Sequence, residues 1–423
     1  MLRVRHLGSL EVGGHGPENP RERHLAAILG ELQRHGPDSR ASIAERCGLG
    51  TSTLSELVGE LRGRRLVTES APVRTRTVGR PLRQLRLDGD GYLVAAVHLA
   101  ASRSEARLAT LGGRELGRAE RRWEPGQDDA GTVITDLLRR LLVEVSPDQP
   151  LLAVEVGVGG VIRRATGRVI NAKAVGLHDR PLGDELLDHL DRLGFDAAVG
   201  IDNDCNFAAL ATVAEAGPTD DRAVTIYVGG EEAVGGTVLV GPNLLRGAGG
   251  AGEIAHWVVD PRGRPCWCGR RGCLCTVANL RGLLTSTGMG PDEAEELVRT
   301  DRRAALARVD AAADAGDPGV DAALQESADG LTSVLHGLQA LLDPERVLIG
   351  GFLGALGRHL EPRLSLRWPA AVGGGSRRED ESPLSVRTVR EPCGAVVDGA
   401  LLSARTRCLE HPLHFSRSYA LPD

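Results

Sequence analysis

The stretch from residue 252 to residue 275 concentrates side chains that bind metals: two carboxylates, a histidine and four cysteines. Three thiolates and one imidazole are the ligand set of a closed structural zinc site. Glycines between the cysteines let such a segment turn sharply around an ion. The stretch therefore predicts one structural Zn²⁺ in a knuckle over residues 256–273, with four ligands: His256, Cys266, Cys268 and Cys273.

A disulfide cluster or a group of buried thiols is the alternative interpretation of these cysteines. Disulfides persist in oxidising compartments, and the N-terminal sequence lacks the apolar core of a signal peptide. No apolar run reaches the ~18 residues that a membrane-spanning helix needs. We therefore expect a cytoplasmic protein with reduced thiols and no membrane partner, which favours metal over disulfides.

Length and charge together suggest separate domains. A chain of 423 residues is too long for one ordinary core, so two or three domains are expected. Residues 1–88 contain fifteen arginines and ten acidic residues, whereas the remainder contains 36 basic and 47 acidic residues. This asymmetry indicates a small nucleic-acid-binding module on an acidic body, with a solvated charged surface as the alternative. Residues 1–20 lack periodicity and are expected to be disordered.

Residues 21–88 have the pattern of a winged helix-turn-helix. Apolar residues follow helical spacing in two segments: Leu25, Ile28, Leu29 and Leu32, then Leu54, Leu57, Val58 and Leu61. A short helix over 40–47 and a turn over 48–50 separate them, and extended segments over 66–68 and 82–87 enclose an arginine-rich loop. This order predicts binding to double-stranded operator DNA, with a three-helix packing module as the alternative.

The candidate DNA contacts lie on the polar face of the third helix and in the wing. Hydroxyl groups suit phosphates or base edges, and wing arginines neutralise phosphates or enter the minor groove. The candidates are Thr51, Ser52, Thr53, Ser55, Arg74, Arg76 and Arg80.

Residues 89–423 alternate between strand and helix patterns, which predicts an α/β body. In its first half we expect strands over 93–98, 106–111, 152–158 and 198–201, and helices over 129–145, 181–193 and 207–215. In its second half we expect strands over 223–228, 236–240, 347–349 and 384–389, and helices over 320–342, 353–364 and from 394 onward. Both halves open with a hairpin, so one unit is expected to occur twice.

The histidine and cysteine spacing resembles the signature of the ROK family (repressor, open reading frame, kinase), GE-x-GH, nine residues, then C-x-CG-x2-GC-x-E. Eight fixed positions match: Gly252, Glu253, His256, Cys266, Cys268, Gly269, Gly272 and Cys273. Ala255 and Cys275 depart from it, and the resemblance extends over residues 23–408, including Gly79-Arg80-Pro81 in the wing. It implies a duplicated actin-like (ribonuclease H-like) sugar-kinase fold preceded by a small winged helix-turn-helix domain. The body, residues 89–423, would bind ligand and dimerise.

The phosphate-binding parts of a kinase are altered. Where kinases of the family carry D-x-GGT, whose aspartate helps to hold magnesium, this chain has His98 followed by Leu-Ala-Ala-Ser. Where they carry GTG-x-G, it has Gly-Gly followed by Glu231, Glu232 and Ala233. Methyl groups and carboxylates at these places oppose a polyphosphate, so we expect no ATP binding and no enzymatic activity.

The sugar-binding parts are better preserved. Asn203 and Asp204 match a pair in which the aspartate is the general base and the asparagine holds hydroxyls, although Asp204 could instead be a helix N-cap. Glu253 and His256 match further hydroxyl ligands, the histidine using one ring nitrogen for zinc and the other for sugar. Other sugar positions have changed: Cys275, Gly159-Gly160 and Ala174-Val175-Gly176-Leu177. Cys275 is interpreted as a small buried thiol, with a spare zinc ligand as the alternative.

These features together predict a ROK-type transcriptional regulator that senses a sugar or sugar-like small molecule, with repression favoured by the resemblance. The expected assembly is a homodimer or homotetramer. A sugar kinase with an unusual nucleotide site is one alternative. The other is a regulator whose body no longer binds sugar.

Overall fold

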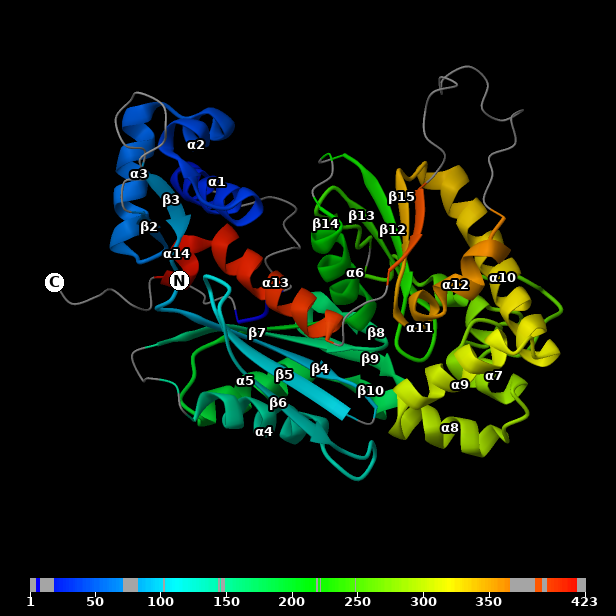
Figure 1. Cartoon of the computed structure of the whole chain (residues 1–423). Coiled ribbons are helices and arrows are strands. Elements are labelled where there is room, and N and C mark those ends of the chain that lie inside the picture. Colours follow the sequence, from blue (N-terminus) through cyan, green and yellow to red (C-terminus); the bar gives the residue numbers. More distant parts are fainter. Residues whose placement is uncertain are drawn as a thin grey trace, which may run out of the picture. The chain divides into compact units, whose positions relative to one another are not determined.

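The computed structural model of the chain (Figure 1) describes residues 5–7, 19–70, 83–101, 103–143, 145, 149–217, 220, 222–247, 249–365, 385–389 and 394–416. The chain divides into two compact units. The first comprises Met1–Asn203 with Ala400–Asp423, and the second comprises Asp204–Gly399. In the described part of the chain no helix is long and apolar enough to cross a membrane.

Three helices and a small sheet form the N-terminal module at the places that the sequence predicts. The elements are α1 (Pro20–His35), β1 (Asp38–Ser39), α2 (Arg40–Cys47), α3 (Thr51–Gly63), β2 (Val67–Glu69) and β3 (Gln84–Leu87). Asn19 and Ser39 cap α1 and α2 through their side chains, and Gly48 ends α2 in the left-handed region at φ 64°. The strands pair antiparallel in the order β1-β3-β2. The winged helix-turn-helix arrangement is therefore present in the described residues.

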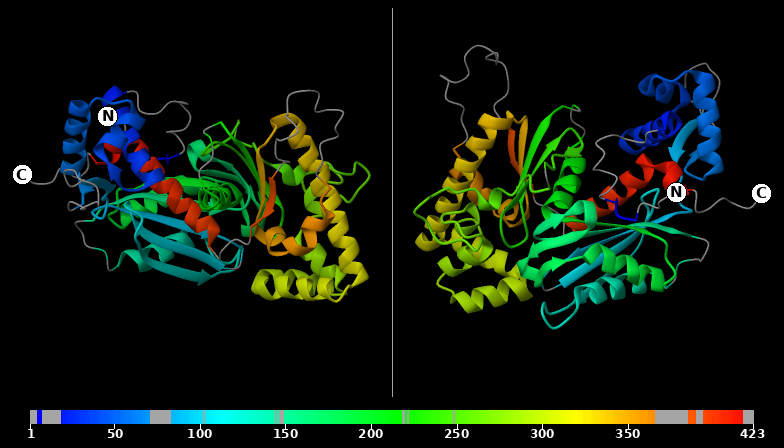
Figure 2. Two further views of the ribbon diagram at one scale, coloured as in Figure 1. Left: turned by 45° about the horizontal axis from the view of Figure 1, so that its top comes forward. Right: turned by 180° about the vertical axis from the view of Figure 1, so that it is seen from behind.

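The rest of the first unit is built on a five-stranded sheet in the order β11-β7-β4-β5-β6. Its strands are β4 (Leu93–Leu99), β5 (Arg103–Thr110), β6 (Glu115–Arg122), β7 (Leu151–Val158) and β11 (Ala198–Asn203). The first three pair antiparallel, and β7 and β11 continue parallel to β4. Helices α4 (Ala130–Leu142) and α5 (Leu182–Arg192) cover one face, and α13 (Ala395–Glu410) crosses the other (Figure 2). A smaller sheet follows β7, formed by β8 (Val161–Arg163), β9 (Arg168–Ala172) and β10 (Leu177–Arg180).

The second unit repeats this topology. Its sheet has the order β14-β13-β12-β15-β16, formed by β12 (Val224–Gly229), β13 (Gly235–Val240), β14 (Asn243–Leu244), β15 (Arg346–Ile349) and β16 (Ser385–Thr388). β12 and β13 form an antiparallel hairpin, and β15 and β16 continue the sheet parallel to β12. This recurrence is the duplicated actin-like fold that the sequence resemblance implied.

Helices of the second unit surround that sheet and the metal-binding stretch. They are α6 (Asp204–Glu215), α7 (Leu280–Ser286), α8 (Pro291–Thr300), α9 (Arg302–Asp314), α10 (Pro318–Leu342), α11 (Gly351–Ala355) and α12 (Gly357–Leu360). The single helix expected over 353–364 is divided between α11, α12 and a 3-10 turn (Glu361–Arg363). Gly357, the first residue of α12, packs closely against β16, because a Cβ atom there would lie 2.3 Å from Thr388 Oγ1.

The N-terminal module is bonded to the first sheet and to the C-terminal helices. The Tyr92 hydroxyl donates to the Arg64 carbonyl at 2.8 Å, and the Gln33 amide donates to Thr406 Oγ1 on α13 at 2.9 Å. Glu22 accepts from the backbone N–H of Leu413 in α14 (Pro412–Ser416) at 3.0 Å. These bonds give the module defined contacts within the first unit.

Residues 5–7 differ from the expectation that the first 20 residues are disordered. The Arg5 carbonyl accepts from the Val199 N–H on β11 at 2.8 Å, and Leu7 is fully buried. One apolar residue, Leu7, in so short a segment carries too weak a signal to predict this docking.

Candidate ligand and metal site

The metal-binding stretch folds into a knuckle between two 3-10 turns, η4 (Ile254–His256) and η5 (Leu274–Thr276). The Leu274 N–H donates to the Trp257 carbonyl at 2.9 Å, which holds the two turns together. Gly272 has a φ of 65°, and a Cβ atom there would lie 1.5 Å from the Asp260 carbonyl oxygen. Glycine is thus required at this place for the chain to pass itself.

The four residues predicted to bind a metal lie together in the knuckle. The ligand atoms of His256, Cys266, Cys268 and Cys273 all lie within 4.8 Å of one another. His256 Nδ1 is 3.6 Å from Cys266 Sγ, and Cys268 Sγ is 3.6 Å from Cys273 Sγ. Zn–S bonds of about 2.3 Å and Zn–N bonds of about 2.0 Å place tetrahedral ligands roughly 3.5–3.8 Å apart. The cluster therefore has the dimensions of a zinc site.

His256 is oriented by its surroundings. Trp267 packs edge-on against the imidazole at a centroid distance of 4.7 Å, and Arg270 donates to the His256 carbonyl at 3.4 Å. Burial, followed by the charge of Arg270, lowers the pKa of His256. A neutral imidazole is the form that binds a metal, and Nδ1 is the nitrogen that faces the thiols.

Two carboxylates of the second unit, Glu253 and Asp204, interact electrostatically. Glu253 precedes η4, and Asp204 is the first residue of α6. Burial, and then the charge of Asp204, raises the pKa of Glu253. Asp204 accepts from the N–H of the adjacent Cys205 at 2.8 Å, which differs from an N-cap bond two or three residues ahead. The two carboxylates are therefore near enough to interact electrostatically.

Asn203 ends β11 in the first unit, directly before Asp204. Its side-chain amide donates to the Gly160 carbonyl at 2.7 Å, and its backbone N–H donates to Asp202 Oδ1 at 2.8 Å. Gly160, which belongs to the Gly159-Gly160 pair that departs from the family motif, is thus bonded to Asn203, a residue predicted to bind sugar.

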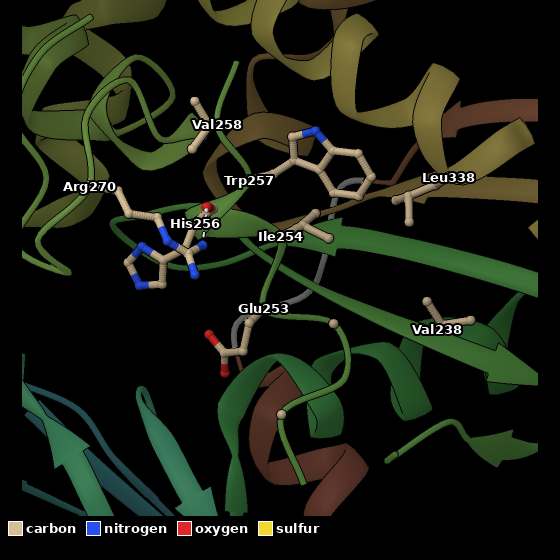
Figure 3. Close-up of a pocket in the computed structure, with 10 residues that line it drawn as sticks. Val238, Glu253, Ile254, His256, Trp257, Val258, Arg270 and Leu338 are labelled. Atoms are coloured by element: carbon tan, nitrogen blue, oxygen red, sulfur yellow. Dashed lines mark hydrogen bonds between the residues drawn. The ribbon is translucent and has the colours of Figure 1, made fainter. Parts of the chain in front are cut away.

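A cavity of about 500 Å³ adjoins the knuckle (Figure 3). Its polar side presents Glu253, His256 and Arg270, and its apolar side presents Trp257 and Leu338 among others. Trp257 is 37% exposed and packs over Gly337 of α10, where a Cβ atom would come within 2.7 Å of the indole. An aromatic surface beside charged groups suits a ligand with both apolar and polar faces.

The two glutamates of the second phosphate loop, Glu231 and Glu232, carry less negative charge together than two fully ionised, unpaired carboxylates would. Glu231 forms an ion pair with Arg302 on α9 at 2.5 Å. Burial, and then the charge of Glu231, raises the pKa of Glu232 to about 7. The ion pair with α9 partly screens this loop, and sequence spacing does not reveal the cation that supplies it. In the other loop His98 is 7% exposed, and the Ala100 carbonyl accepts from the Trp123 indole at 2.7 Å.

The candidate DNA-contacting residues of α3 lie on its exposed face. Thr51, Ser52, Thr53 and Ser55 are exposed, whereas the leucines and the valine of the opposite face are buried. Arg40 donates to Ser55 Oγ at 3.3 Å and pairs with Glu69 at 2.7 Å, so it is a cation beside α3 that the sequence did not single out. Arg74, Arg76 and Arg80 lie outside the described residues.

Comparison with known proteins finds a matching family and several similar proteins. The ROK family model matches residues 104–386, which is more than half of the chain. A glucokinase of Halalkalibacterium halodurans is 29% identical over 306 residues, covering 68% of this chain and 89% of the glucokinase. A xylose repressor of Caldicellulosiruptor bescii is 27% identical over 254 residues, covering 58% and 61%.

A solved structure extends the likeness to the whole length. The crystal structure of a ROK family transcriptional regulator, a homologue of the Escherichia coli MLC protein, superposes with a TM-score of 0.73 at 21% identity. The superposition covers 94% of this chain and 99% of the chain of that regulator. The shared fold thus includes the N-terminal module as well as the two-lobed body.

Proposed function

The chain belongs to the ROK family, and on this premise we propose that it is a DNA-binding transcriptional regulator, acting as a repressor, whose body senses a sugar or a related small molecule. The observation that carries the proposal is the N-terminal module. Its third helix turns a row of hydroxyl side chains outward and its leucines inward. Such a helix is suited to the major groove, and the arginine-rich wing is suited to phosphates or the minor groove.

Loss of kinase activity is part of the proposal. Phosphoryl transfer depends on positioning a metal ion and on stabilising developing charge. His98 stands where the family's kinases hold magnesium with a carboxylate, and Glu231 and Glu232 stand in the second phosphate loop. Glu231 is paired and Glu232 is partly protonated at neutral pH, but their carboxyl groups still stand where the family's kinases place a polyphosphate.

The sugar-binding function is proposed for Asn203, Asp204, Glu253 and His256. Carboxylates accept from sugar hydroxyls, and amide and imidazole groups donate to them or accept from them. The electrostatic interaction of Asp204 with Glu253 in the second unit supports their use of one ligand. The chain would then share with a glucokinase the residues that bind sugar, but not the loops that bind phosphate.

The knuckle is proposed to hold one Zn²⁺ through His256, Cys266, Cys268 and Cys273. When bound, zinc would supply structural cross-linking rather than reaction chemistry, since the four protein ligands fill its tetrahedral positions. The three cysteines and the histidine fix the ends of η4 and η5, and they thereby position Glu253 just before η4.

Regulation would couple the two functions. A cytoplasmic homodimer or homotetramer would present paired modules to a pseudo-palindromic operator with half-sites about 10 base pairs, or a multiple of that, apart. Sugar can change operator affinity only as far as it binds one conformation better than the other. Thermal unfolding across a sugar panel distinguishes this from a regulator without ligand control, because a regulator of that kind shows no shift with any sugar.

Selection of DNA from random sequence by the full-length protein tests the proposed function. We expect enrichment of a two-fold symmetric sequence, and we expect ATP consumption with hexoses to stay at the level of an Asp204→Asn variant. Absence of any enriched sequence, together with turnover above that variant, would identify a kinase instead.

A further inference from the structure

The knuckle contains a fifth metal donor that the proposed ligand set does not use. Cys275 lies on η5, two positions after Cys273, where the ROK motif has a glutamate. Its Sγ atom is 3.6 Å from Cys266 Sγ and 3.9 Å from His256 Nδ1. Thiolate is a ligand that zinc prefers. Five donors are therefore available for four tetrahedral positions.

The position of Cys275 relative to the cluster defines which ligand it can replace. Cys266 Sγ and His256 Nδ1 are 3.6 Å apart, so Cys275 Sγ completes a triangle with this pair. All three edges are close to the roughly 3.5–3.8 Å that separates neighbouring ligands of one tetrahedral zinc ion. Cys275 thus lies next to the imidazole that it would replace and next to Cys266, which would remain a ligand.

The backbone keeps the Cys275 thiol at this place. The Thr276 N–H donates to the Cys273 carbonyl at 2.8 Å, and the Asn279 side chain donates to the Cys275 carbonyl at 3.0 Å. The residue is half-buried rather than packed into the core. The backbone hydrogen bonds therefore hold the Cα atom of Cys275 beside the cluster, with the Sγ atom 3.6 Å from Cys266 Sγ.

We propose that Cys275 is an alternative fourth zinc ligand that replaces His256 and converts the site from three thiolates and an imidazole to four thiolates. This rests on the zinc site of the proposed function and deepens it. In the exchange a Zn–N bond breaks and a Zn–S bond forms, and the Cys275 thiol releases its proton to solvent. No electron is transferred, and the site gains one negative charge.

The exchange gives the knuckle two states with the same metal and different ligand chemistry. In one state His256 offers a single ring nitrogen to a ligand, and in the other the whole imidazole is available. Since His256 lines the cavity with Glu253 and Arg270, the metal would stay bound while the binding surface changes. Metal retention and ligand recognition are then separable properties of this chain.

Cobalt substitution in the full-length protein tests the proposal, because thiolate-to-Co²⁺ absorption increases with the number of thiolate ligands. The variants are His256→Ala, Cys275→Ser and the double variant, with Cys47→Ser on α2 as the matched cysteine control. We expect His256→Ala to bind one metal with less than a tenfold loss of affinity and with stronger thiolate absorption than wild type. The double variant should lose more than a hundredfold, because loss of an outer-shell partner alone costs about 10–100-fold.

A second measurement avoids dependence on the folding of the His256 variants. At one neutral pH the cobalt-substituted wild type should show stronger thiolate absorption than cobalt-substituted Cys275→Ser, because the state with four thiolates contributes to its spectrum. Coincident wild-type and Cys275→Ser spectra would overturn the proposal, as would equal metal loss by the folded single and double variants. A wild-type protein that binds no metal would instead refute the zinc site of the proposed function.

Discussion

Replacing Arg164 by Met should destabilise the first unit more than any exposed arginine substitution. Arg164 is 6% exposed and Glu155 is fully buried on β7. Two bonds join them, Nη1 to Oε2 at 3.0 Å and Nη2 to Oε1 at 2.8 Å. Ser403 on α13 donates to the same carboxylate at 3.0 Å, and Asp202 lies 3.4 Å from the guanidinium. Removal of the arginine leaves two buried carboxylates without their cation.

The expected cost is about 3–5 kcal/mol, the range for breaking a buried ion pair by removal of one partner. Native-state hydrogen exchange suits a chain of two units, because it reports each unit separately. Amides of β7 and β11 should exchange roughly a hundredfold to a few thousandfold faster, since 1.4 kcal/mol corresponds to about tenfold. The exposed neighbour Arg163 provides the control, and Arg163→Met should change stability by less than about 0.5 kcal/mol.

A double substitution distinguishes the loss of the ion pair from the burial of an unpaired charge. Glu155→Gln with Arg164→Met removes both charges and should restore a large part of the lost protection. If Arg164→Met exchanged no faster than Arg163→Met in β7 and β11, the buried pair would not support this sheet, and the reasoning from its geometry would be refuted.

Three further predictions concern the metal, the altered phosphate loop and the DNA-binding module. Cys268→Ser should reduce zinc content well below one per chain by elemental analysis, whereas Cys47→Ser should retain it; a zinc-replete Cys268→Ser protein contradicts the ligand set. Glu232 has a raised pKa, so the folded state binds its proton more tightly and stability from this group falls as pH rises from about 4.5 to about 7. Glu232→Gln should remove that slope in thermal unfolding between pH 5 and 8, and an unchanged slope would exclude this assignment. Arg80→Ala should weaken all DNA sites alike and lower the salt slope by about one unit, whereas Ser52→Ala should change which sequence is selected; the reverse pattern in anisotropy titrations counts against the module.

Elements with strong local signals could be predicted from the sequence. The second helix was expected over 40–47 and occurs as Arg40–Cys47, because Ser39 caps it and Gly48 ends it. β7 was expected from its apolar run and is buried along its whole length. The metal cluster was also predictable, because its ligands are close in sequence as well as in space.

Elements and contacts that depend on the folded environment could not be predicted. β6 has the sequence ELGRAERR, whose charges suit an exposed edge strand but give no apolar alternation. The sequence patterns of the segment with α7, α8 and α9 do not predict these helices, and α9 in particular is rich in alanine and arginine with a narrow buried face. The ion pair between Glu231 and Arg302 and the bond from Arg40 to Ser55 join residues distant in sequence, for which no spacing rule exists.

Sequence-specific DNA binding is tested by titrating the selected DNA sequence with full-length protein. Fluorescence anisotropy would compare wild type with a Thr51→Ala, Ser52→Ala, Thr53→Ala variant, whose substitutions lie on the exposed face of α3. Wild type should bind the selected sequence at least about a thousandfold more tightly than random DNA, and the variant should lose most of this preference while retaining its fold. Equal affinity for selected and random DNA, in wild type and variant alike, would contradict the assignment of this protein as a sequence-specific regulator.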